Sequence, residues 1–84
     1  MQHRRRGCTL HWDVLRITAE KRAEMWKASV YDRNENATVY QAERMRAEDA
    51  MRDAVAFSVR RLFGSSSGFS PGLLVHMLPW KWFG

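Results

Sequence analysis

The chain has 84 residues, one cysteine and a formal net charge of +5 at pH 7. This length excludes more than one domain, and a single cysteine excludes an internal disulfide. Extra burial against a second copy or a protein partner is therefore expected, and the positive charge favours an anionic partner such as an acidic protein face, nucleic acid or anionic lipid.

The start of the chain carries the highest density of positive charge. Arg4, Arg5 and Arg6 are consecutive, and no acidic residue precedes Asp13. We expect residues 1–8 to form a basic flexible arm, whose arginines can neutralise phosphate groups. The sequence shows no secretory signal and no apolar run long enough to span a bilayer, so a cytoplasmic or host-cell location is expected and a membrane partner is not.

Residues 9–17 are ambiguous. Leu10, Trp12 and Val14 follow an alternating pattern that is typical of a strand, whereas Leu10, Val14 and Ile17 share one face of a helix. The pattern favours an extended segment slightly and leaves the helix open.

Residues 19–31 show helical spacing. Small and apolar residues recur at steps of four, three and four positions: Ala19, Ala23, Trp26 and Val30. This spacing predicts a helix with one apolar stripe. The polar residues 32–36 then predict a turn.

Residues 38–63 carry the most complete set of helix signals. Thr38 and Gln41 match a capping box, and Gly64 suits the position after the last helical residue. The apolar stripe comprises Ala47, Ala50, Met51, Ala54, Phe57, Ser58 and Leu62. Together with the preceding segments, this predicts a helical domain over residues 9–63.

The last third of the chain changes in composition. Residues 64–72 are rich in glycine and serine and predict a linker. Residues 73–84 form an apolar aromatic tail with a single charge, Lys81. Trp80, Trp82 and Phe83 are large and rigid, as interface anchors are.

The sequence therefore predicts a mostly α fold: an antiparallel two-helix hairpin with an ambiguous extended N-terminal segment and an aromatic C-terminal tail. Ala47, Ala50 and Ala54 would allow a second helix to approach closely, which makes a homodimer plausible.

The sequence gives little support for a catalytic site or a metal site. Cys8 and His11 are close in sequence, but a chain with so small a core is not expected to hold them in a dry, preorganised site. His3, Cys8 and His11 make up only half of a zinc-ligand pattern. The glycines form no phosphate-binding loop. We expect no enzyme activity, no metal and no cofactor.

The leading functional hypothesis is a non-catalytic regulatory or adaptor protein that binds a protein partner, inhibition of that partner being one such role. Its anchors would be Trp80, Trp82 and Phe83. Exposed arginines of the long helix would supply complementary charge: Arg52, Arg60 and Arg61.

The alternative hypothesis is nucleic-acid binding. An extended segment over 10–17, a helix over 19–31 and a second helix from Thr38 resemble the ribbon-helix-helix class of DNA-binding dimers, over about half of the chain. The resemblance implies that His11 on the ribbon faces the major groove. Phosphate contacts would come from the basic arm: Arg4, Arg5 and Arg6.

Overall fold

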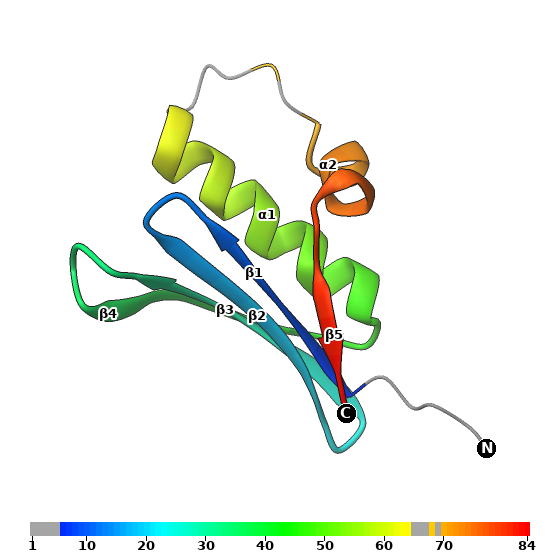
Figure 1. Cartoon of the computed structure of the whole chain (residues 1–84). Coiled ribbons are helices and arrows are strands. Elements are labelled where there is room, and N and C mark those ends of the chain that lie inside the picture. Colours follow the sequence, from blue (N-terminus) through cyan, green and yellow to red (C-terminus); the bar gives the residue numbers. More distant parts are fainter. Residues whose placement is uncertain (1–5, 65–67, 69) are drawn as a thin grey trace.

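A five-stranded antiparallel sheet with two helices on one side makes up the chain (Figure 1). The structure is a computed structural model and describes residues 6–64, 68 and 70–84. The strand order is β4-β3-β2-β1-β5. In chain order the elements are β1 (Gly7–Trp12), β2 (Leu15–Arg22), β3 (Met25–Asp32), β4 (Ala37–Arg44), α1 (Ala47–Phe63), α2 (Pro71–Met77) and β5 (Lys81–Phe83).

The predicted mostly α fold is wrong, because residues 19–31 form a β-hairpin and not a helix. β2 and β3 pair from Leu15↔Asp32 to Arg22↔Met25, with a two-residue turn at 23–24. Ala23 has a φ of 55°, a left-handed conformation that breaks any helix at this point. The helical spacing was coincidental, since Ala19 and Val30 are buried here through the alternation of two strands.

The predicted capping box is also wrong. Thr38 and Gln41 lie in β4, and α1 begins only at Ala47. Val39 and Tyr40 lie between Thr38 and Gln41, and both are residue types that favour a strand, here paired with β3. The helix end was predicted correctly, since α1 stops at Phe63 and Gly64 follows with a φ of 88°.

The ambiguous segment at 9–17 is extended, as the pattern slightly favoured. It forms the end of β1 and the start of β2, joined by a turn at 13–14. The helix that the ribbon-helix-helix resemblance requires over 19–31 is therefore missing, and the resemblance does not extend to the fold. The polar turn predicted at 32–36 is confirmed in position, because β3 ends at Asp32 and β4 begins at Ala37.

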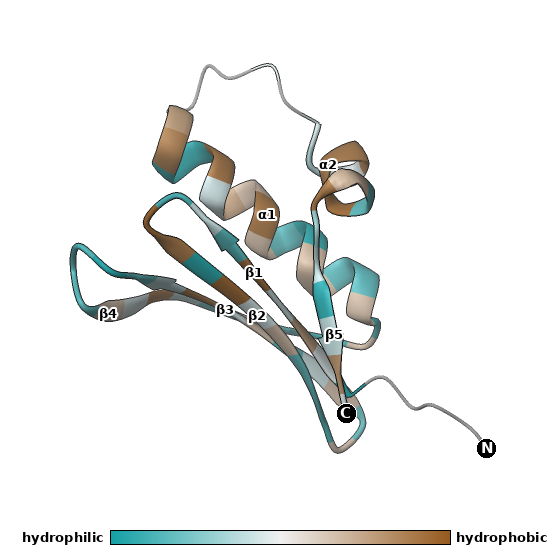
Figure 2. Cartoon of the chain, viewed as in Figure 1, coloured by the Kyte–Doolittle hydropathy of each residue, from teal (hydrophilic) through white to brown (hydrophobic). Residues whose placement is uncertain are grey.

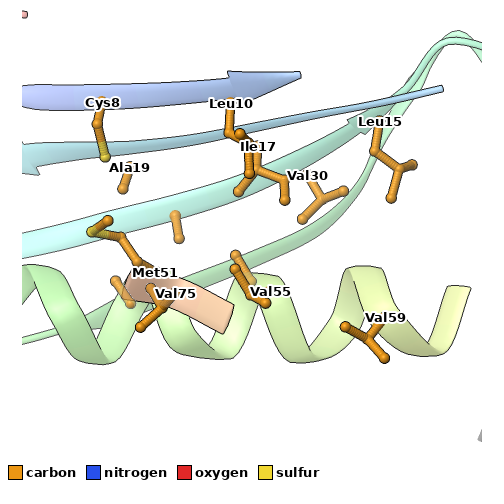
Figure 3. Close-up of a cluster of buried hydrophobic side chains, with 13 residues drawn as sticks. Cys8, Leu10, Leu15, Ile17, Ala19, Val30, Met51, Val55, Val59 and Val75 are labelled. Carbon is orange, nitrogen blue, oxygen red and sulfur yellow. The ribbon is translucent and has the colours of Figure 1, made fainter. Parts of the chain in front are cut away.

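The core lies between one face of the sheet and α1. Leu10, Ile17 and Val30 project from neighbouring strands toward Val55 of the helix (Figure 3). Ala54 on α1 is fully buried, and so is Ala50. The alanine face predicted to receive a second copy is therefore covered by the chain's own sheet.

The opposite side is called the open face of the sheet. It carries polar side chains in cross-strand rows, among them His11, Arg16 and Tyr31, which are register partners on β1, β2 and β3. Arg16 stacks its guanidinium over the Tyr31 ring at 4.8 Å. No described element packs on this face as a layer (Figure 1).

The Ala23 turn permits a test that separates a hairpin from a helix by the sign of its result. In the hairpin, Ala23→Gly removes a left-handed alanine and is expected to raise the free energy of unfolding by about 0.5–1 kcal/mol. In a helix interior the same change would lower it by about 1 kcal/mol. Urea denaturation followed by fluorescence measures the sign, with Glu24→Ala as the neighbouring control.

Asp32 fastens the end of α1 to the turn between β3 and β4. Its Oδ2 accepts a hydrogen bond from Arg61 Nε at 2.7 Å, and its Oδ1 accepts one from the backbone N–H of Asn34 at 2.8 Å. The Asp32 side chain is buried. The hydrogen bond from Arg61 is the main cause that lowers the pKa of this carboxyl below its ordinary value.

This lowered pKa predicts a stability loss in acid. The carboxylate stabilises the fold above the unfolded-state pKa of about 3.9, and that contribution disappears as the pH falls through the lower folded-state pKa. Between pH 6 and pH 3, the urea midpoint should therefore drop more for the wild type than for Asp32→Asn, because asparagine cannot titrate. An equal drop in both proteins would contradict this role.

Candidate functional site

A groove of about 450 Å³ lies where the first half of α1 meets α2 and the chain leading into β5. It is open to solvent on one side. The described residues that line it are Ala47, Glu48, Met51, Val75, His76, Leu78, Pro79, Trp80 and Trp82. Two segments far apart in the sequence, residues 47–51 and residues 75–82, thus build one concavity.

α2 forms because Pro71 suits the first helical position, and a single buried side chain, Val75, anchors the helix beside Met51 (Figure 3). The chain then turns back through Leu78 and Pro79. The indole Nε1 of Trp80 donates a hydrogen bond of 2.8 Å to the carbonyl oxygen of Val75, which fixes the ring against α2.

β5 brings Trp82 to the same groove. β5 pairs with β1, and the register partner of Trp82 is Cys8, which faces the core. Trp82 therefore projects on the helix side of the sheet and remains 36% exposed. Cross-strand pairing and one indole hydrogen bond together hold the two tryptophans along the groove.

The groove wall combines apolar surface with one polar pair. His76 Nε2 lies 3.8 Å from Glu48 Oε2, and both side chains are half or more exposed. The rest of the lining is mainly aliphatic and aromatic. Figure 2 shows hydrophobic ribbon over much of α2, where Leu73 and Met77 are 68% and 76% exposed.

Comparison with protein-family models, curated proteins and solved structures finds no match.

The predicted aromatic anchors do not form one surface. Trp80 and Trp82 both line the groove, but Phe83 faces the other way. Its ring occupies the place of a Cβ at Gly7, on the open face of the sheet, and is 44% exposed. Strand alternation puts adjacent residues on opposite faces, so Trp82 and Phe83 cannot act together.

The predicted arginines are also dispersed and largely engaged. Arg52 pairs with Asp49 at 2.9 Å, close to the start of α2. Arg61 pairs with Asp32 at the far end of α1. Arg60 is exposed near that far end and lines a shallow hollow beside β4. These side chains do not converge on the groove.

Two of the residues predicted to bind nucleic acid, Arg4 and Arg5, lie outside the residues that the structure describes. Arg6 is exposed, and its backbone N–H donates to the carbonyl oxygen of Phe83 at 3.0 Å. His11 is exposed on the open face opposite Arg16. Arg6 precedes β1 and is separated from His11 by five positions.

Cys8 is placed for packing and not for chemistry. Its side chain is fully buried, and burial raises the pKa of the thiol to about 12, so little thiolate is present at neutral pH. His11 projects from the opposite face of β1, so the two side chains cannot share a substrate or a metal ion. Over residues 6–64, 68 and 70–84, no three histidine, cysteine or acidic side chains come together as a metal site. Neither described helix is long and apolar enough to cross a membrane.

Sequence reasoning missed Glu48 and His76 as site residues. They are separated by 28 positions along the chain and share no motif. Ser70 and Pro71 are typical of a helix start, so the sequence contained a signal that could have predicted α2.

Proposed function

We propose that this protein is a non-catalytic regulatory or adaptor module that binds a segment of a protein partner in the groove between α1, α2 and β5. The observation that carries the proposal is the pair of tryptophans along an open apolar concavity, beside the exposed Leu73 and Met77. Tryptophan is enriched at the centres of protein interfaces, where it supplies large, rigid contact area.

Charge defines the partner segment further. The described groove lining includes one carboxylate, Glu48, and neither lysine nor arginine. The neighbouring Arg52 is neutralised by Asp49. A segment that presents an apolar side chain next to a positive charge would therefore complement the groove, in place of the acidic face expected from the net charge. The proposal places the protein in a reducing compartment such as the cytoplasm, where the free thiol of Cys8 would be stable.

Paired variants test this function. The full chain is immobilised, and proteins captured from an extract of the native host are compared with those captured by His76→Ala/Trp82→Ala, which removes two exposed lining side chains, and by Gln41→Asp, which alters the exposed open face. Circular dichroism verifies folding of each. The proposal expects a specific partner to be lost at least tenfold from the groove variant and kept by Gln41→Asp. The reverse pattern would refute the groove as the binding site.

Nucleic-acid binding on the open face is a second candidate. The specific observation is the stacking of Arg16 on Tyr31 opposite His11, which forms a cationic and aromatic platform on the sheet. Such binding should weaken steeply between 50 and 200 mM salt, as phosphate contacts do. Retention of single-stranded DNA at low salt that Arg16→Ala abolishes would favour this candidate, and no retention at low salt would exclude it.

A further inference from the structure

The groove lining carries a negative side chain, although the net charge of the chain is positive. The chain carries +5 overall, yet Glu48 is the one lining side chain among the described residues that is charged irrespective of histidine protonation. The Glu48 carboxylate is about half exposed at the rim, 3.8 Å from His76 Nε2. A cation in the groove would therefore be attracted by Glu48 and would not be repelled by a lysine or arginine among the described lining residues.

The two indole rings add to this attraction. A cation over the face of an aromatic ring interacts with the ring quadrupole, and tryptophan provides the strongest such contact. The Trp80 ring is fixed by its hydrogen bond to Val75, and the backbone of Trp82 is fixed by strand pairing with Cys8. Both indoles line the groove in the folded chain.

The kind of cation follows from the hydrogen-bonding capacity of the lining. An ammonium group has three N–H donors and a guanidinium has five, and each donor needs an acceptor when it leaves water. Among the described lining side chains, the carboxylate of Glu48 and the imidazole of His76 are the strong hydrogen-bond acceptors, and the other lining side chains are aliphatic or aromatic. A trimethylammonium group has no N–H donor, and its methyl groups suit apolar walls.

We propose that the groove recognises a trimethylated ammonium group, presented as the side chain of a trimethylated lysine on the protein partner. This inference rests on the proposed function and names the chemistry of the segment that enters the groove. The volume of about 450 Å³ lies within the range of about 300–1,000 Å³ that is common for ligand pockets, so the head group and part of its alkyl chain can be accommodated.

The first experiment isolates the charge. The full chain is titrated with choline and with 3,3-dimethyl-1-butanol, its neutral isostere, while tryptophan fluorescence is recorded. We expect choline to bind about tenfold more tightly than the isostere, and Glu48→Gln to remove most of that difference. Trp82→Leu should weaken choline binding, whereas Trp82→Phe should keep part of it. Equal affinities for choline and the isostere, or no binding of either, would overturn the proposal.

The second experiment identifies the source of the group. Two peptides of the same sequence, one with trimethyllysine and one with unmodified lysine, are compared with phosphatidylcholine vesicles. Preference for the methylated peptide is the expected result. Binding to the vesicles without preference for the methylated peptide would overturn the protein source. If choline fails but the His76→Ala/Trp82→Ala variant still loses a partner that Gln41→Asp keeps, the proposed function stands and only the ligand chemistry is wrong.

Discussion

Replacing Ile17 with alanine is expected to lower the free energy of unfolding by about 3 kcal/mol. Ile17 lies at the centre of the sheet, between Leu10 on β1 and Val30 on β3, and its side chain is fully buried. The change removes three buried carbons and leaves a cavity beneath α1, which costs about 2–5 kcal/mol in well-packed cores. For a chain of this length the loss is a large share of the total stability.

The matched control is Thr18→Ala, one residue along the same strand. Thr18 projects to the open face, where the change should cost less than about 1 kcal/mol. Chemical denaturation of the two variants gives the comparison. Similar losses at both positions would mean that β2 does not have one buried and one open side.

Trp80→Ala is expected to cost about 2–3 kcal/mol, and at least 1 kcal/mol more than Trp82→Ala. Trp80 is partly buried against the core and bonds to Val75 through its indole N–H, so its loss removes both packing and a hydrogen bond. Trp82 is a third exposed and is also held by β5 pairing. Thermal unfolding measures the ranking.

Trp80→Phe separates the two contributions of Trp80. It keeps an aromatic ring but removes the N–H donor, so about 1 kcal/mol should be lost. If Trp80→Ala were as stable as the wild type, the indole would not hold α2 in place. The proposed binding groove would then lack its support. Functional tests of the groove therefore use Trp82 and the exposed residues of α2, which leave Trp80 intact.

The sequence allowed the second half of α1 to be predicted because independent signals agreed there. Ala54 and Ser58 continue one stripe, Arg60 and Arg61 suit the last turn, and Gly64 ends the helix. Such agreement was missing from the hairpins. Their turns begin with Asp13 and Ala23, which adopt positive φ without the glycine or asparagine that usually marks a hairpin.

The strands themselves carried a usable signal. From Leu15 to Glu20 the residues alternate strictly between buried and open sides, with Ile17 and Ala19 inward and Arg16 and Thr18 outward. The many alanines obscured this pattern because alanine fits helical and strand spacing alike. At Thr38 and Gln41, a chance match to a capping box placed the N-cap eight residues before the actual N-cap, Arg46.

The groove could be predicted only in part. Trp80 and Trp82 attracted attention by composition, but their partners depend on how α2 folds back onto α1. That return is set by the packing of Val75 into the core beside α1, which no local sequence signal predicts, whereas the hydrogen bond from Trp80 to Val75 spans only five residues. The separation of Phe83 from Trp82 follows from strand alternation once β5 is known.

Site-specific photo-crosslinking tests the central claim, that the groove is the binding surface, most directly. A benzophenone amino acid replaces His76, an exposed residue of the groove lining, or Gln41 on the exposed open face. Both proteins are irradiated in an extract of the native host. We expect a single crosslinked partner from position 76 and none from position 41. A partner that crosslinks from position 41 and not from position 76 would contradict the claim.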